Sequence, residues 1–266
     1  MTKILRSILI PLVSIGVVGL IWQLVVVGFH VQPYVAPRPW DAVMAVVHNW
    51  GLLWPLVLGT IRETVYGFLS GALLGLVLGV VMAKVGLIRR LIYPLLVLSQ
   101  AVPIIALASP LVLILGFSVT PKIVIVAWIV FFPVTVNVVD ELTHVDQDLL
   151  NLARVYGASS WRTFTQIELP AISTPLFSGL KIGATYAVGG AIIAELVGST
   201  GSSLAYYQEH ASANLQTPAV YGTTLVMTVI GIGWFLLIAG LEMVLTPWQR
   251  RNTARRRRVA APSGVH

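Results

Sequence analysis

The chain has 266 residues, of which 57% are hydrophobic and only 10% carry a charged side chain. A soluble domain has about 25% charged residues, because its surface must be solvated. The composition therefore excludes a soluble globular domain and a disordered tail. The chain contains no cysteine, which excludes disulfide bonds, thiol catalysis and cysteine-based metal sites.

The formal net charge of +7 comes almost entirely from one end of the chain. Six arginines lie among the last 17 residues, at positions 250, 251 and 255–258, and without them 11 basic residues face 10 acidic ones. A basic block after an apolar segment is typical of a cytoplasmic flank that fixes membrane topology, and it also suits anionic lipid headgroups. We expect no nucleic-acid binding, because no aromatic or β-sheet platform accompanies the arginines.

Six apolar segments are candidates for membrane-spanning helices, each of which needs about 20 residues. They are residues 10–27, 64–83, 91–117, 123–139, 175–197 and 221–241. The third contains Pro103 and Pro110, and such breaks are tolerated where a helix lines a cavity. The fifth must hold Lys181, Glu195 or both at membrane depth, because its uncharged interior is too short to cross. The sequence predicts an all-α polytopic membrane protein with six transmembrane helices.

Topology follows from the distribution of Lys and Arg between the short loops. If the N-terminus lies in the cytoplasm, residues 84–90, the loop 143–174 and the tail 249–266 lie there too, and these hold most of the basic residues. The first apolar run is too long for a signal peptide and lacks a cleavage site, so we expect a retained helix and two cytoplasmic termini.

Two patterns within the spans suggest packing and function. Glycines at positions 67, 71, 75 and 79 recur on one helix face, where small residues let another helix approach closely. Polar side chains inside spans are costly and often functional, although for Gln100, Asn137 and Thr185 hydrogen bonds that only pack the helices are the favoured interpretation. The candidates for a translocation path are Gln100, Asn137, Thr185, Tyr186 and Glu195.

The loop 143–174 is the only sizeable polar segment on the inner side. Asp146 or Asp148 can cap a helix that carries Leu149, Leu152, Ala153 and Tyr156 on one face, and Gly157 suits its end. A second short helix begins at Ser159 or Ser160, and Pro170 is expected to stop it. The element is then a helix–glycine–helix hairpin, which either binds a partner or lies at the membrane interface without one.

The spacing of this loop resembles the cytoplasmic signature of ABC importer permeases. Gly157 is followed after nine residues by Ile167, and then by Leu169 and Pro170. The family motif opens with Glu-Ala-Ala, whereas this chain has Asn151, Leu152 and Ala153, so a charged contact is replaced by an amide. Residues 99–103, 115–122, 131–137, 194–198 and 241–248 resemble the nitrate/sulfonate/taurine branch. Residues 183–191 are similar to permeases for thiamine-precursor pyrimidines.

The resemblance implies a type I ABC importer permease fold in the bacterial plasma (inner) membrane. It implies cytoplasmic ATP-binding subunits, an extracytoplasmic solute-binding protein and a second permease copy, with a homodimer expected. Residues 1–55 would hold the first helix, residues 56–248 the permease core, and residues 249–266 the basic tail. The ATPase-coupling contacts would fall on Asp148, Leu149, Asn151, Leu152, Ala153, Arg154, Tyr156, Gly157 and Ala158.

Enzyme activity in this chain is not expected. No Gly-Lys dipeptide occurs, so a Walker A loop is impossible and ATP hydrolysis is expected on a partner. The five histidines lack the spacing of a metal site, and no cofactor is expected. The solute is expected to be a small molecule such as a thiamine-precursor pyrimidine, with a sulfonate, taurine or nitrate as alternatives. An ion-coupled secondary transporter is the alternative of another class, for which Glu195 is the weak coupling candidate.

Overall fold

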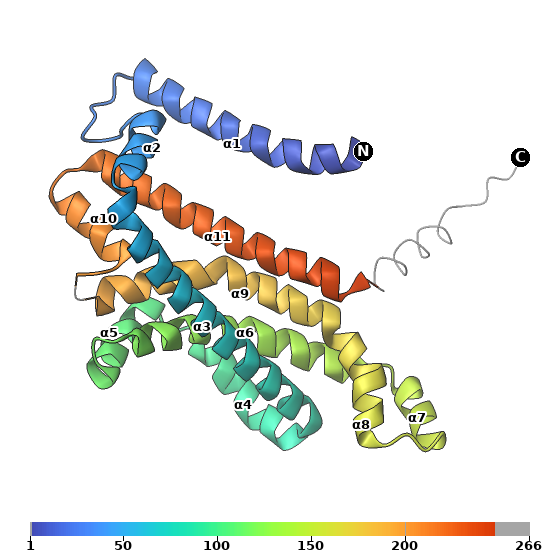
Figure 1. The fold of residues 1–266 in the computed structure, drawn as a ribbon. Coiled ribbons are helices and arrows are strands. Elements are labelled where there is room, and N and C mark those ends of the chain that lie inside the picture. The colour runs from blue at the N-terminus through green and yellow to red at the C-terminus, as the bar shows by residue number, and fades with distance from the viewer. Residues whose placement is uncertain (1, 200, 248–266) are drawn as a thin grey trace, which may run out of the picture. The chain divides into compact units, whose positions relative to one another are not determined.

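The computed structural model describes residues 2–199 and 201–247, and those residues form helices and connecting loops without any strand (Figure 1). The expected basic tail 249–266 lies outside the described residues. The first helices are α1 (Thr2–Gly28), α2 (Pro39–His48), α3 (Trp50–Lys84), α4 (Gly86–Ser99), α5 (Ile104–Leu115) and α6 (Val119–His144). Then follow α7 (Gln147–Val155), α8 (Ser160–Thr163), a π-helical turn (Phe164–Glu168), α9 (Leu169–Gly198), α10 (Leu204–Ala213) and α11 (Thr217–Leu245).

The helices agree with a polytopic membrane protein, so the all-α membrane fold predicted from composition is confirmed. Four helical stretches are long and apolar enough to cross a membrane, namely α3, α6, the stretch Ser160–Gly198 and α11. Helices α4 and α5 together make a fifth candidate. The first predicted segment falls within α1, which is 27 residues long.

The third predicted segment differs from a straight span. Helices α4 and α5 are bent by 102° at a short break. Pro103 is the N-cap of α5 in an extended conformation, which is the conformation that lets a new helix begin with a changed direction. A proline has no N–H to continue the preceding helix, so the chain turns here, whereas Pro110 is accommodated inside α5.

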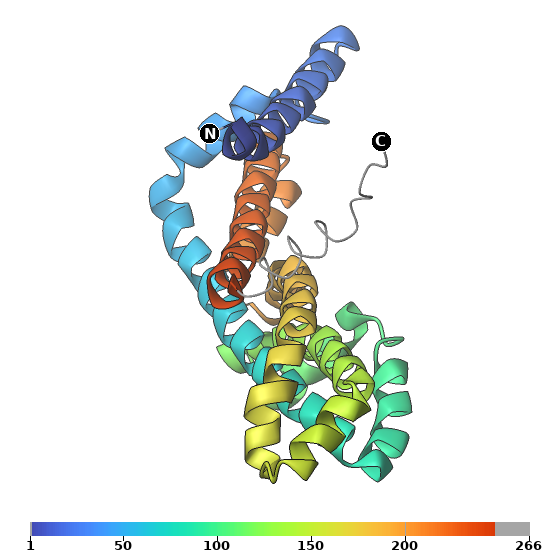
Figure 2. The ribbon, with the colours of Figure 1, turned by 90° about the vertical axis from the view of Figure 1, so that its right-hand side faces the viewer.

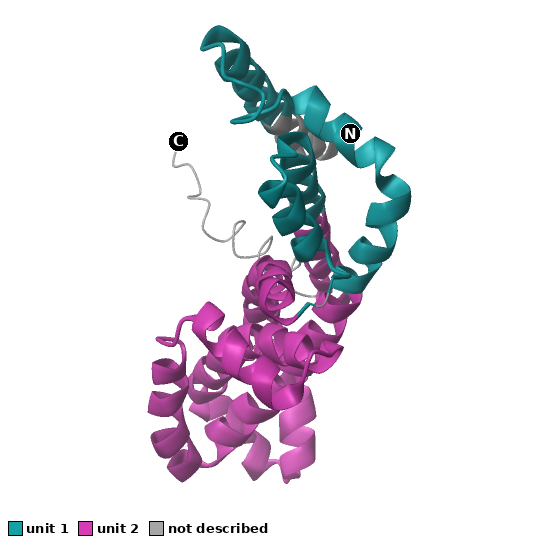
Figure 3. Ribbon diagram, turned by 90° about the vertical axis from the view of Figure 1, so that its left-hand side faces the viewer, with its two compact units in different colours: residues 1–61, 199–229 teal, residues 62–198, 230–266 magenta. Residues whose placement is uncertain are grey.

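The chain divides into two compact units (Figure 3). Unit 1 consists of residues 1–61 and 199–229, and unit 2 of residues 62–198 and 230–266. Within unit 1, the rings of Trp22 and Tyr221 lie 5.5 Å apart between centroids, and the Thr217 hydroxyl donates to the Tyr34 carbonyl at 2.9 Å. These contacts connect α1 and the loop after it to α11.

The core of unit 2 is built around α6, which contacts both α3 and α9 (Figure 2). A Cβ atom added to Gly71 would lie 2.5 Å from the Ala127 carbonyl oxygen, and one added to Gly75 would lie 2.6 Å from the Phe131 oxygen. On α9, a Cβ at Gly179 would lie 2.8 Å from the Pro133 oxygen. The glycine stripe of α3 is therefore a close-packing face, as its spacing predicted.

The close approach of α3 and α6 can be tested with a glycine-to-alanine substitution. Steric overlap with α6 lowers the stability of such a variant, whereas the higher helix propensity of alanine raises it. We expect Gly75→Ala to destabilise the permease by about 1–3 kcal/mol, because the new methyl group meets a backbone carbonyl that cannot move aside. Alanine is otherwise the better helix former by about 1 kcal/mol. Gly59→Ala, on the same helix with open space at the Cβ position, is the control. Equal thermal unfolding temperatures for the two variants would contradict the packing.

Candidate coupling loop and translocation path

Helix α7 is fixed at both ends by local hydrogen bonds. The Asp146 carboxylate accepts the backbone N–H of Asp148 at 2.9 Å, which makes Asp146 the N-cap. At the other end, Gly157 has φ +72°, a conformation that favours glycine. The N–H groups of Gly157 and Ala158 donate to the carbonyls of Arg154 and Ala153, both at 2.9 Å, which is the Schellman pattern. The helix and its glycine stop are as the sequence predicted.

The apolar residues of α7 face outward rather than into unit 2. Leu149, Leu152 and Tyr156 are 49%, 53% and 82% exposed, while Ala153 is half-buried. Val155 adds a further side chain that is 83% exposed. A row of this kind costs free energy in water, about 25 cal/mol for each Å² of apolar surface, unless another surface covers it.

The polar residues of α7 lie exposed beside this row. Asp148, Asn151 and Arg154 are all exposed, and Arg154 Nη1 donates to Asn151 Oδ1 at 3.3 Å. Asn151 occupies the position at which the family motif has its acidic residue. The Asn151 side-chain oxygen therefore accepts a hydrogen bond from an arginine of its own helix.

The return arm of the hairpin differs from the prediction, because Pro170 does not stop it. Ser159 caps α8 by accepting the Arg162 N–H at 3.3 Å, as expected. The chain then continues through the π-helical turn into α9, and the Leu169 N–H donates to the Phe164 carbonyl. Pro170 directly follows the π-helical turn, and the helix continues across it although proline has no N–H to donate. Ile167 is half-buried in this junction, whereas Leu169 and Pro170 are exposed.

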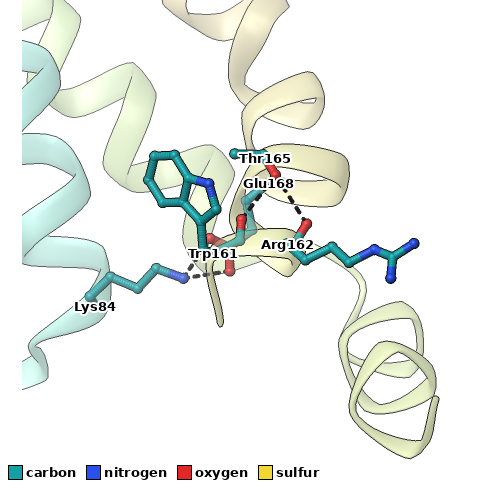
Figure 4. Close-up of polar contacts among 5 residues, drawn as sticks. All are labelled: Lys84, Trp161, Arg162, Thr165 and Glu168. Carbon is teal, nitrogen blue, oxygen red and sulfur yellow. Dashed lines mark hydrogen bonds and ion pairs between the residues drawn. The ribbon is translucent and has the colours of Figure 1, made fainter. Parts of the chain in front are cut away.

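An ion pair that the sequence analysis missed holds the base of the hairpin (Figure 4). The Lys84 ammonium, at the end of α3, donates to both carboxylate oxygens of Glu168 at 2.5 Å. The Glu168 side chain is 7% exposed. The only signal in the sequence was an acidic residue between Ile167 and Leu169. The pair brings the basic loop 84–90 and the hairpin to the same end of unit 2.

A cavity of about 610 Å³ on unit 2 brings four of the five path candidates together. It is lined by Gln100, Ile104, Ile129, Phe132, Pro133, Val136, Asn137, Ile182, Thr185, Tyr186, Gly189, Gly190 and Ile193. None of these lining residues is charged. Asn137 donates to the Pro133 carbonyl and Thr185 to the Lys181 carbonyl, at 2.7 and 2.8 Å, so both bond within their own helices rather than across the bundle.

Glu195 does not line this cavity. It is 1% exposed and interacts with Glu63, whose Oε1 accepts from Lys122 Nζ at 2.8 Å. All three ionisable side chains are buried, and they come from α3, α6 and α9. Lys181 is also paired, with Glu242 of α11 at 2.8 Å. The two charges of the fifth span are thus both accommodated by partners inside unit 2.

Residues 71–251 match the family model described as the binding-protein-dependent transport system inner membrane component. The chain belongs to this family. It is therefore an ABC transporter permease with a multi-pass fold of the inner membrane, and its type I permease fold agrees with the helices described above. The family implies an ATPase and a solute-binding protein as the other components of the transporter, and its members are permease components rather than enzymes.

Several permeases are similar to this chain over most of their length. A Haemophilus influenzae protein named "Probable ABC transporter permease protein" is 33% identical over 84% of this chain and 90% of its own length. The formylaminopyrimidine transport permease ThiX of Halalkalibacterium halodurans is 29% identical over 83% of this chain and 88% of its own length. The riboflavin transport system permease RibX of Chloroflexus aurantiacus is 33% identical over 81% of this chain and 78% of its own length.

Proposed function

We propose that this permease forms the solute path of an importer and is coupled to separate ATP-binding subunits through α7. The observation that carries the proposal is the exposed row of Leu149, Leu152 and Tyr156 on a helix capped at both ends. An amphipathic helix of this kind is recognised by laying its apolar face into a groove. Asn151 and Arg154, beside the row, would make the polar contacts at its edge.

Movement of α7 would reach the membrane helices by two routes. The return arm of the hairpin is continuous with α9, and the Lys84–Glu168 pair attaches its base to α3. ATP-driven closure of the ATPase subunits would then move α3 and α9 together, as in a rigid-body switch between inward-open and outward-open states. Both termini would lie in the cytoplasm with the hairpin.

The uncharged cavity of unit 2 would form part of the translocation path. A second copy of the permease would complete the path, with a homodimer as the simplest assembly, and the solute-binding protein would deliver solute from the outer side. Gln100, Asn137, Thr185 and Tyr186 are the residues we assign to this surface. Glu195, held in its buried cluster, would act on the helices rather than contact the solute.

The lining favours an uncharged heteroaromatic solute of the thiamine-precursor pyrimidine type. The amides of Gln100 and Asn137 can pair with ring nitrogen and amino groups, and Phe132 and Tyr186 offer aromatic faces. A sulfonate or nitrate would leave an anion in the cavity without an opposing cation, and zwitterionic taurine would leave both of its charges without a charged partner in the lining, which is costly. The relatives named for formylaminopyrimidine and riboflavin transport support the same choice.

The proposal is tested by purifying the permease together with its ATPase and binding protein and reconstituting the complex. We expect vanadate-sensitive ATP hydrolysis that solute-loaded binding protein stimulates, and uptake that requires all components. Uptake by this chain alone in vesicles would contradict the proposal and support the ion-coupled alternative. Calorimetry on the cognate binding protein identifies the solute, and binding of taurine or another sulfonate there would overturn the pyrimidine assignment.

The cavity assignment predicts a selective loss in Tyr186→Ala. Removing one aromatic contact costs about 0.5–1.5 kcal/mol, so we expect uptake to fall by about two- to tenfold, with basal ATP hydrolysis and ATPase binding unchanged. Tyr66→Ala, at an exposed tyrosine of α3 that does not line the cavity, is the matched control. Equal uptake by the two variants would contradict the assignment of Tyr186 to the translocation path.

A further inference from the structure

A second cavity, of about 450 Å³, lies at the start of α4 and has a different chemistry. It is lined by Gly86, Arg89, Arg90, Tyr93 and Pro94. These residues recur at the spacing of one helix face, so the cavity follows the first two turns of α4. It therefore lies at the end of unit 2 where Lys84 meets the hairpin, and away from the uncharged cavity.

The two arginines are free to bind an anion. Both are exposed, and neither takes part in an ion pair or side-chain hydrogen bond among the described residues, in contrast to Lys84, Lys122 and Lys181. Each guanidinium presents several donors in a plane that matches a phosphate group. The neighbouring carbonyl of Arg90 also lacks its usual helical donor, because Pro94 has no N–H. The site thus offers cationic donors and one acceptor.

An apolar stripe continues from the arginines along the adjacent face of α4. Leu87, Leu91, Leu95 and Leu98 are each 62–67% exposed and recur at helical spacing. The opposite face packs inward, where Ile88, Ile92 and Tyr93 contact the buried cluster of Met82, Leu96 and Val139. The leucine stripe therefore faces away from the core of unit 2.

We propose that this cavity binds the headgroup of an acidic glycerophospholipid, with the acyl chains along the leucine stripe. The phosphate would lie against Arg89 and Arg90, and a headgroup hydroxyl would donate to the Arg90 carbonyl. Basic pockets beside transmembrane helices suit such headgroups. The exposed leucines decide between a lipid and a soluble phosphate, because only the lipid covers apolar surface. The proposal requires only that this end of unit 2 lies at a membrane surface, and does not depend on the ATPase contact.

Native mass spectrometry of the purified full-length permease tests the site with phosphatidylglycerol and phosphatidylcholine of identical acyl chains. We expect the first phosphatidylglycerol to be retained preferentially, and the preference to fall by about fivefold for each arginine lost in Arg89→Gln and Arg90→Gln. Arg154→Gln combined with Arg162→Gln removes the same charge from the hairpin and is the control. Thermal unfolding temperatures verify that all variants remain folded.

Three results would overturn the proposal. One is an equal preference for phosphatidylglycerol in the wild type and the Arg89/Arg90 double variant. Another is an equal loss in the hairpin control, because this would mean that net charge alone attracts the lipid. The third is displacement of phosphatidylglycerol by millimolar inorganic phosphate at constant ionic strength, which would mark a site for soluble phosphate.

Discussion

Replacing Leu152 by aspartate is expected to separate the permease from its ATPase. The side chain lies in the middle of the exposed apolar row of α7 and is itself 53% exposed, so the change places a charge in the interface without disturbing the fold. Central interface residues of this kind contribute about 2 kcal/mol or more, which is a loss of affinity of about 30-fold. Co-purification and uptake by the reconstituted transporter should both fall accordingly.

The control for this result uses the same helix and the same charge. Gln147→Asp adds an aspartate to the exposed first turn of α7, outside the apolar row, and we expect no loss of binding. Tyr156→Ala, which shortens the row without adding charge, should weaken binding in the same direction as Leu152→Asp. Intact ATPase binding in both Leu152→Asp and Tyr156→Ala would refute the assignment of α7 as the coupling helix.

Replacing Lys122 by methionine is expected to destabilise unit 2 strongly. Lys122 is the one basic side chain in the buried cluster with Glu63 and Glu195, and its own side chain is only 10% exposed. Its removal leaves two buried carboxylates without a cation, and breaking a buried pair in this way costs about 3–5 kcal/mol. The measurement is the thermal unfolding temperature of the purified permease.

Two further variants separate the charge effect from a general packing effect. Adding Glu63→Gln to Lys122→Met removes one uncompensated charge and should restore part of the lost stability. Lys181→Met breaks the pair of Lys181 with Glu242, whose side chains are more exposed, at 29% and 19%, so we expect a smaller loss. If Lys122→Met were no more harmful than Lys181→Met, the cluster would have no special role in stability.

The elements that the sequence predicted well are those set by local chemistry. Apolar runs placed the membrane helices, the Gly67–Gly79 spacing predicted a packing face, and Asp146 with Gly157 predicted both ends of α7. Each of these signals acts within a few residues of the structure it determines. Amphipathicity alone leaves the hairpin open between a partner-binding helix and an interfacial one, and the resemblance to the family signature is the reason for proposing the partner-binding role.

The features that the sequence did not predict depend on contacts between distant residues. Glu63 and Lys122, or Lys84 and Glu168, are far apart in the chain, and no local pattern pairs them. The prolines indicated a break in the third segment, but the 102° bend depends on how α5 packs against α6 and α9. Pro170 was misread because the π-helical turn before it, which lets the helix continue, has no recognisable sequence pattern.

The two ion pairs of α3 have a mechanical consequence. Glu63 and Lys84 are joined by unbroken helix with a rise of about 1.5 Å per residue, so the pairs lie about 32 Å apart. This is close to the thickness of the hydrocarbon layer, about 30 Å. Between them, the glycine stripe holds α3 tightly against α6. The segment from Glu63 to Lys84 is therefore held by an ion pair at each end, and a movement of the hairpin would be transmitted along α3 as far as Glu63 with little bending.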